Sequence, residues 1–330
     1  MSFKRIFFLR TAAAAAAGIL MAFSAATAGA QSWKPEKPVE LLVSSAPGGS
    51  NDRIARVIQQ IVQERNLVPV SMSVINRPGG NQTLSRTYIN QNPGDPHYFD
   101  IGNPTLIANT ISGLQQYTDF TPIALMVNEY TAFSVRADSP LNNARDLVEQ
   151  IKKDPGSVAI GVSNRGGTNH LSMSLLAKAA GIDPRSLKVV VFKTNAEGLA
   201  GVMGGHIQLV ASAVGTGMNA MRGGKTKIVS VSSPQRMGGA LAEVPTLREQ
   251  GYDVSLSNWR AIIGPRGLAP AHVSYWEGVL AGVIATDEWK AVLVKQFWDG
   301  NFLRSAEFGT YLRKEHEQTR SLMMELGQAK

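Results

Sequence analysis

The sequence has no cysteine among its 330 residues. This excludes disulfides, thiolate metal sites, a cysteine nucleophile and the lipid-bearing cysteine of a lipoprotein anchor. Histidine is scarce: the five residues His97, His170, His206, His272 and His316 show no H-E-x-x-H or comparable metal spacing. We therefore expect no metal ion and no cofactor.

Charge is also limited, at 18% of residues, and the lysines and arginines are scattered rather than clustered with aromatic residues. Such a pattern gives no nucleic-acid footprint, so we expect no nucleic-acid partner. The hydrophobic content of 44% is typical of a globular chain. The net charge of +8 is modestly positive, which favours anionic solutes.

One long apolar run occurs, and it lies at the N-terminus. Lys4, Arg5 and Arg10 precede an apolar stretch over 11–26, and Ala28-Gly29-Ala30 supplies a small-residue cleavage pattern. These features predict a secretory signal peptide over residues 1–30 and a periplasmic mature protein. A permanent membrane anchor is less favoured, because the run is shorter than the roughly 20 residues that a bilayer requires. Removing three basic residues lowers the net charge from +8 to +5.

The mature chain alternates between short apolar runs and helical patterns. A strand over 39–45 leads through a tight loop to a helix with Ile54, Val57, Ile58 and Ile61 on one face. Further strands are predicted over 68–75 and 99–102. This alternation predicts an α/β sheet that is largely parallel.

A second block has its own strand and helix units. Strands are predicted over 158–161, 189–192, 208–213 and 228–232, and helices over 169–180 and 197–204. Two extended crossings, over 124–135 and 254–264, make this block an insertion in the first, and the chain ends in helical segments. We therefore expect an α/β, two-lobed periplasmic-binding-protein fold with two hinge-crossing strands. Lobe 1 comprises residues 31–126 and 258–330, and lobe 2 residues 127–257.

The first candidate site is the loop Pro47-Gly48-Gly49-Ser50-Asn51-Asp52 between a strand and a helix. Glycine allows a tight turn and a close approach of the backbone to a ligand. Unpaired amides at the following helix start can hold a carboxylate or phosphate. The polar residues are equally consistent with a plain helix cap. The loop lacks the dinucleotide and triphosphate motifs, so neither ligand is indicated.

The second candidate is the loop Ser163-Asn164-Arg165-Gly166-Gly167-Thr168-Asn169-His170. Arg165 is suited to grip a carboxylate through two hydrogen bonds, although a solvated loop arginine fits the pattern equally. His170 is better explained as a structural hydrogen-bonding residue than as a metal ligand. The segment misses the second glycine of G-x-S-x-G, so the hydrolase elbow fails and we expect no enzyme.

These motifs occur in an order that resembles one known family, the receptor component of tripartite tricarboxylate transporters, or Bug proteins. The resemblance rests on Ala46-Pro47-Gly48-Gly49, Asn76-Arg77-Pro78-Gly79-Gly80, Gly204-Gly205-His206-Ile207, Glu243-Val244-Pro245-Thr246-Leu247 and Asn258-Trp259. It implies a periplasmic solute-binding protein that closes on a small organic acid and delivers it to a two-component membrane permease. A monomer is expected. The alternative is a periplasmic sensor that docks on a membrane signalling protein.

The resemblance also implies the ligand-binding residues. They are Ser45, Ala46, Gly48, Gly49, Ser50, Asn51 and Asp52 in the first loop, Ser163, Asn164, Arg165, Gly166, Thr168, Asn169 and His170 in the second, and Lys193, Thr194 and Asn195 in a third. Ser44-Ser45 replaces a usual proline and aromatic residue, which predicts a roomier pocket. Gln208 replaces a usual aspartate, which argues against an amino-acid ligand if its side chain faces the cleft.

Overall fold

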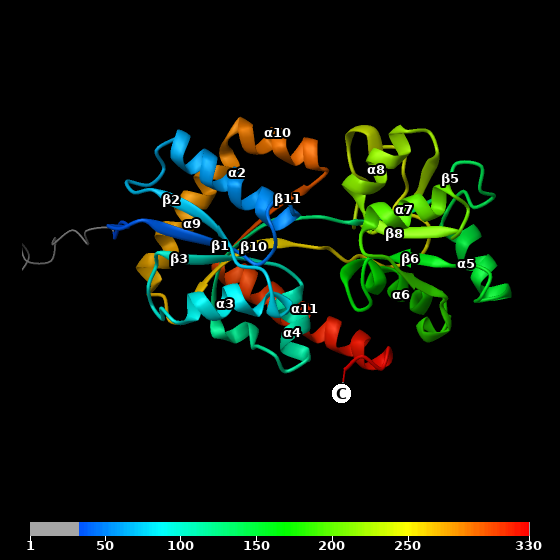
Figure 1. Cartoon of the computed structure of the whole chain (residues 1–330), viewed down its shortest axis with the longest axis horizontal. Helices are drawn as coiled ribbons and strands as arrows, with labels where there is room; N and C mark the ends of the chain where they lie inside the picture. Colours follow the sequence, from blue (N-terminus) through cyan, green and yellow to red (C-terminus); the bar gives the residue numbers. More distant parts are fainter. Residues whose placement is uncertain (1–32, 330) are drawn as a thin grey trace, which may run out of the picture. The chain divides into compact units, whose positions relative to one another are not determined.

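The computed structural model describes residues 33–329, which contain two β-sheets (Figure 1). The signal-peptide prediction concerns residues 1–30, which lie outside the described residues. The first sheet has the strand order β11-β4-β10-β3-β1-β2. Its strands are β1 (Val39–Val43), β2 (Met72–Asn76), β3 (Tyr98–Gly102), β4 (Phe120–Asn128), β10 (Arg260–Pro265) and β11 (Asp299–Arg304). The second has the order β7-β6-β8-β5-β9. Its strands are β5 (Thr131–Arg136), β6 (Ile160–Val162), β7 (Val189–Val191), β8 (Leu209–Ala213) and β9 (Thr226–Val231).

Helices accompany both sheets (Figure 1). The first sheet is accompanied by α2 (Ser50–Glu64), α3 (Thr83–Asn90), α4 (Thr105–Ile111), α9 (Pro270–Ala285), α10 (Asp287–Gln296) and α11 (Ser305–Glu325). The second is accompanied by α5 (Ala144–Lys153), α6 (Thr168–Ala179), α7 (Asn195–Met203) and α8 (Val214–Arg222). Four short 3₁₀ turns connect elements: η2 (Gly80–Gln82), η3 (Tyr117–Asp119), η4 (Pro184–Ser186) and η5 (Gly239–Leu241). None of the helices within residues 33–329 combines the length and apolarity needed to cross a membrane.

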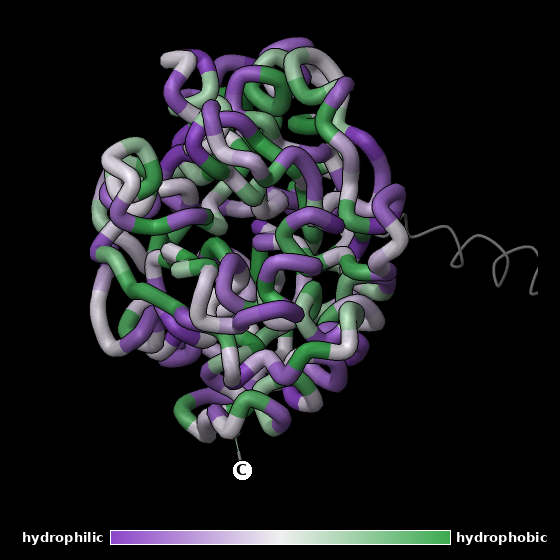
Figure 2. Tube along the Cα trace, turned by 90° about the vertical axis from the view of Figure 1, so that its right-hand side faces the viewer, coloured by the Kyte–Doolittle hydropathy of each residue, from purple (hydrophilic) through white to green (hydrophobic). Residues whose placement is uncertain are grey.

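Apolar periodicity explains why these segments fold as they do. Strand β1 reads Val-Glu-Leu-Leu-Val and is almost wholly buried, as expected for a strand covered on both faces. Helix α2 buries Ile54, Ile58 and Ile61 at helical spacing. Hydrophilic and hydrophobic residues alternate along much of the trace (Figure 2), so helices present one face to a core and the other to solvent.

Each sheet has its own apolar core. Trp259 lies at the centre of the first, with its ring centroid 5.7 Å from Phe308 and 6.2 Å from Tyr311 in near-perpendicular contacts. Such edge-to-face contacts are the arrangement that aromatic quadrupoles favour. In the second, Phe133 packs with aliphatic side chains of α5, α6 and β8. The cores fix the two sets of loops that the site requires.

The sheets are mixed, which corrects the expectation of a largely parallel arrangement. Strand β1 pairs in parallel with β2 and β3, and β6 with β7 and β8. Strands β10 and β11 pair antiparallel with their neighbours, and β5 runs antiparallel to both β8 and β9. Strands β4, β5 and β10 flank the two crossings, and every pairing of these three strands is antiparallel. Strand β11, near the C-terminus, was not expected.

The two crossings are tied to each other. The chain passes from β4 to β5 through Glu129 and Tyr130, and returns through Ser257 and Asn258 to β10. Tyr130 and Ser257 form an antiparallel bridge, and the Asn258 amide donates to the Glu129 carbonyl at 2.7 Å. Because both crossings pass side by side, side chains of Glu129 and Asn258 meet although they are far apart in the sequence.

Candidate functional site

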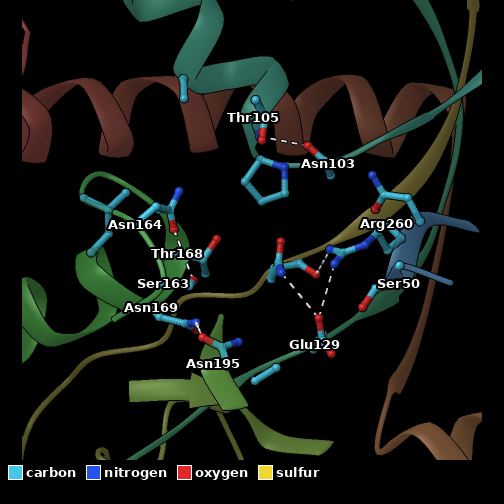
Figure 3. A pocket seen from close by; sticks show the side chains of 18 of the residues that line it. Ser50, Asn103, Thr105, Glu129, Ser163, Asn164, Thr168, Asn169, Asn195 and Arg260 are labelled. Atoms are coloured by element: carbon cyan, nitrogen blue, oxygen red, sulfur yellow. Dashed lines mark hydrogen bonds and ion pairs between the residues drawn. The ribbon is translucent and has the colours of Figure 1, made fainter. Parts of the chain in front are cut away.

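A polar cavity of about 1110 Å³ is lined by residues from elements of both sheets. In Figure 3, Ser50 and Arg260 lie on one side of this cavity, and Ser163, Asn164 and Thr168 on another. The carboxyl ends of β1, β3, β6 and β8 lead into lining segments. This is the edge at which open α/β sheets bind their ligands.

The first predicted loop forms part of the lining through Ser45, Gly49, Ser50 and Asn51. Helix α2 begins at Ser50, and its cap residue Gly49 contributes no side-chain hydrogen bond. The first amide bonded within the helix is that of Arg53, which donates to the Gly49 carbonyl at 2.9 Å. The amides of Ser50 and Asn51 therefore have no intrahelical acceptor and stand at the positive end of the helix. The Ser45 Oγ is buried and has no hydrogen-bond partner among residues 33–329.

Asp52 supports this loop from outside the cavity. Its carboxylate accepts from the Gly48 amide, from Arg56 Nε and from Asn76 Nδ2, each at 2.9 Å. Burial raises the pKa of Asp52, but these three hydrogen bonds outweigh burial and lower the pKa to about 2. Gly48 has φ of +85°, a left-handed conformation that favours glycine. The carboxylate thus fixes the turn that presents the next amides.

The second predicted loop lines the cavity from Ser163 to Asn169. It repeats the plan of the first, because α6 begins at Thr168 after the cap residue Gly167, which gives no side-chain cap. His170 closes the loop by accepting the Gly166 amide on Nδ1 at 3.0 Å. Burial, with a smaller contribution from Arg165, lowers the pKa of His170, so the ring is neutral and suited to accept. In this position His170 is a hydrogen-bond acceptor within its own loop.

Arg165 lies on the cavity lining and is exposed. Its Nη2 donates to the Val189 carbonyl at 3.2 Å, which leaves other guanidinium hydrogens available. Arg165 is therefore a solvated loop residue that also lies where a carboxylate in the cavity could be reached.

Two more helix starts reach the cavity, through Asn195 on α7 and through Gly215 and Thr216 on α8. Asn195 accepts from Asn169 Nδ2 at 3.4 Å (Figure 3). Helix α8 has no side-chain cap, like α2 and α6. Because helix N-termini carry partial positive charge, four of them around one cavity create a site suited to an anion.

Several predicted residues do not line the cavity. Those outside the lining are Ala46, Gly48, Asp52, His170, Lys193, Thr194 and Gln208. Lys193 and Thr194 instead cap α7, since the Lys193 amide donates to Glu197 and Thr194 Oγ1 accepts from the Glu197 amide.

Gln208 requires a correction. It precedes β8, whereas the cavity is reached from the other end of that strand at Ala213. Its Oε1 accepts the Ala159 amide at 2.9 Å, which joins the starts of two strands. Gln208 therefore lies away from the cavity, and the replacement of the family's usual aspartate by glutamine gives no information about the ligand.

A buried ion pair on the lining was missed from the sequence. Arg260 Nη2 lies 3.2 Å from Glu129 Oε2, and the two side chains are 6% and 8% exposed. Asn258 Nδ2 also donates to Glu129 Oε2, at 3.3 Å (Figure 3). Arg260 Nη1 donates to two backbone carbonyls, while its Nε is buried without a partner among the described residues. No local pattern joins residues 129 and 260; only the crossing of the chain does.

A second missed element is the turn that follows β2. Gly79, Gly80, Asn81 and Gln82 all have positive φ, at +123°, +57°, +50° and +71°. A left-handed backbone at a residue other than glycine costs on the order of 1–3 kcal/mol, so Asn81 and Gln82 are held there by their surroundings. Both line the cavity.

Behind this turn lies Arg86, which is fully buried. Its Nε is 3.3 Å from Asp100 Oδ2, and both side chains are 0% exposed. Burial raises the pKa of Asp100 against the opposing influence of Arg86. The Arg86 Nη2 donates to Gln82 Oε1 at 3.2 Å, which links the buried pair to the lining.

A third missed residue is Glu315 on α11, which lines the cavity and is 7% exposed. Burial raises its pKa to about 7, and the neighbouring Trp259 and Tyr311 offset only part of this rise. Among residues 33–329 it has no ion-pair partner. The cavity wall thus contains an acid that retains its proton at mildly acidic pH.

The lining therefore offers hydroxyls, amides, guanidinium groups and helix-start amides. No histidine is among the lining residues of the described chain, and no group of three or more potential metal ligands occurs within 33–329. The hydroxyl, amide and guanidinium groups of the lining are hydrogen-bond donors of the kind suited to an oxyanion.

The sequence matches the family described as "Tripartite tricarboxylate transporter family receptor" over residues 54–327. A curated relative, the "UPF0065 protein in gbd 5'region" of Cupriavidus necator, is 23% identical over 99% of both chains. A solute-binding protein from Polaromonas superposes with a TM-score of 0.78 at 24% identity, covering 88% of this chain and 99% of that one. An R. palustris protein solved with adipate gives 0.73 at 24%, covering 89% and 99%. The chain has the two-lobed fold of these solute-binding proteins and belongs to the receptor family of tripartite tricarboxylate transporters.

Proposed function

We propose that this protein captures a small organic carboxylate in the periplasm and delivers it, unchanged, to a two-component permease of the tripartite tricarboxylate type. The observation that carries the proposal is the convergence of four helix starts on one polar cavity, three of them without a side-chain cap. Unpaired amides at a helix N-terminus bind carboxylate oxygens, and a pocket of this size accommodates a small acid.

The two loops are proposed to share the ligand. A carboxylate at Ser50 and Asn51 would meet Thr168 and Asn169 across the cavity, since all four residues line it. Ligand contacts to both sets of loops favour a closed arrangement, because only that arrangement makes all of them at once. In this proposal lobe 1 (31–126 and 258–330) and lobe 2 (127–257) move about the paired crossings.

Adipate, bound in the R. palustris neighbour, indicates the chemical class to test first. The mature protein, without residues 1–30, is screened by thermal shift against succinate, malate, adipate, citrate and benzoate, with glucose and putrescine as neutral and cationic controls. A ligand at a hundredfold excess over Kd adds about 2.7 kcal/mol to the free energy of unfolding, which gives a measurable shift. Native mass spectrometry of the purified protein identifies a solute that is retained from the cell.

The carboxylate assignment fails if the acids give no shift while glucose or putrescine does. Chromatography of the acid after prolonged incubation tests whether it is returned unchanged. The permease is tested separately, by uptake of the same acid in membrane vesicles that carry the two permease subunits. A sensor role is the alternative, and uptake that is independent of this protein, with specific binding to a signalling protein, would favour it.

A further inference from the structure

The side chain of Gln82 has a fixed orientation at the edge of the cavity. Its Oε1 accepts from Asn103 Nδ2 at 2.8 Å, from Ser44 Oγ at 3.0 Å and from Arg86 Nη2 at 3.2 Å. Turning the amide over would place its hydrogens against the N–H donors of Asn103 and Arg86. Since hydrogen-bond partners decide the orientation of an amide, the oxygen faces the protein interior.

Two partners of Gln82 are themselves fixed as donors. Asn103 Oδ1 accepts the Thr105 amide at 3.0 Å (Figure 3), so its Nδ2 is the end that faces Gln82. An arginine has only donors. The orientation thus follows from Asn103 and Arg86, and the Ser44 hydroxyl, which can donate or accept, is compatible with it.

The other end of the amide remains available. Gln82 Nε2 donates to no acceptor within residues 33–329, and the residue lines the cavity together with Asn81 and Asn103. Because Gln82 lines the cavity and its oxygen is bonded to the protein, the Nε2 end with its two N–H groups is the part of the side chain left for a ligand. The cation of Arg86, fully buried behind the amide, polarises it and strengthens these donors.

The backbone holds the amide in place. Asn81 Nδ2 donates to Asn109 Oδ1 at 2.6 Å, and Asn109 Nδ2 returns a bond to the Asn81 carbonyl at 2.9 Å. This exchange locks the left-handed turn on α4. A donor that is already positioned loses little freedom when a ligand binds, which favours affinity.

We propose that the Nε2 of Gln82 binds a carboxylate or carbonyl oxygen of the captured solute, and forms an oxygen subsite distinct from the two helix-start loops. The inference rests on the proposed function, because it names a contact of the same cavity. A solute that makes this contact carries, besides the carboxylate bound at the loops, a second oxygen that accepts a hydrogen bond from Gln82.

The test is Gln82→Glu, which keeps the size of the side chain and the oxygen bonded to Arg86 but replaces the donor with a second oxygen. Calorimetric titrations with succinate, malate, adipate and citrate are expected to give a Kd weaker by on the order of 10- to 100-fold for those acids that bind the parent. The unfolding temperature is expected to stay at or above that of the parent, because Arg86 gains an anionic acceptor. The added charge also repels an anion without any contact, so a purely structural role for Gln82 predicts a loss in Gln82→Glu that added salt weakens and unchanged affinity in the neutral variant Gln82→Gly.

Two further variants make the result decisive. Gln235→Glu introduces the same charge in an exposed loop outside the lining and is expected to bind within twofold of the parent. Gln82→Gly suits the left-handed backbone and removes the donor without adding a charge, with an expected loss on the order of tenfold. Affinity of either Gln82 variant within twofold of the parent overturns the proposal while the proposed function stands. Absence of binding by the parent to every acid refutes the proposed function itself.

Discussion

The buried acid Glu315 should make the stability of the protein depend on pH in a defined direction. Its carboxyl is 7% exposed, lines the cavity and has a pKa raised by burial from an ordinary value of 4.5 to about 7. The perturbation is Glu315→Gln, which is neutral at every pH and resembles the protonated acid in size and charge. Any cost of ionising Glu315 is therefore absent from the variant.

The magnitude follows from proton linkage. An acid with a raised pKa binds its proton more tightly in the folded protein than in the unfolded chain. Stability is consequently lost as pH rises from the unfolded pKa near 4.5 through the folded pKa near 7. The full loss corresponds to about 3 kcal/mol, and roughly 2–3 kcal/mol of it falls between about pH 5 and about pH 8.5. We expect Glu315→Gln to gain that much relative to the parent over this interval.

The assay is urea unfolding followed by tryptophan fluorescence, with parent and variant compared at each pH. The comparison cancels groups that titrate equally in both proteins. Glu317→Gln is the matched control, because it makes the same substitution at an exposed acid two residues further along the same helix. A parent-to-Glu315→Gln difference that stays constant within about 0.5 kcal/mol from pH 5 to 8.5 refutes the reasoning.

Three further substitutions separate binding from stability. Gly49→Val should weaken the binding of every carboxylate by about tenfold or more, and equal affinity in calorimetry would argue against the first loop as anchor. A small decrease in the unfolding temperature is expected, because φ of −70° suits valine but the added Cβ lies only 3.2 Å from Ser45 Oγ, which must shift. Glu129→Gln leaves the Arg260 charge buried without its partner and should cost about 3 kcal/mol in urea unfolding, much of which a second change, Arg260→Met, should restore. Asp52→Asn should lower the unfolding temperature at neutral pH and flatten the decline of that temperature between about pH 4 and 2. The reason is that stability from a lowered pKa is lost as pH falls through the pKa of the folded protein. An unchanged acid profile of the unfolding temperature would contradict a stabilising role of the Asp52 carboxylate.

The sequence predicted those parts of the fold that depend on local pattern. Strand β1, the glycine loop and helix α2 lie within a few residues of their expected positions, because a buried strand and an amphipathic helix each have a distinct period. Strand β11 escaped prediction because Asp299–Arg304 has no apolar run and contains Gly300. Its pairing with β4 supplies the order that its own residues do not specify.

The site was predicted only where one loop holds several of its residues. Both glycine loops reach the cavity, as their place between strand and helix indicated. The pair Glu129 and Arg260 depends on two distant crossings. Gln82 has a left-handed backbone that asparagine favours but glutamine does not, so its own residue type gives no signal. The prediction that Gln208 lies at the site was wrong, because a departure from a family pattern does not show which end of a strand faces the cavity.

Under the proposed function, an anion is attracted both by the lining cations Arg53, Arg165 and Lys295 and by the helix-start dipoles. Glu129 is compensated by Arg260, and burial keeps Glu315 protonated at mildly acidic pH, so neither acid then opposes an anion. The helix-start amides provide a fixed positive potential that attracts any oxyanion, whatever the rest of the molecule. A side-chain donor such as Gln82 acts differently, because it is directed at one position. It increases the affinity for an acid only if a second oxygen of that acid reaches it. Changes in the loop backbone should therefore decide whether acids bind at all, and changes in the side chains which acid is preferred.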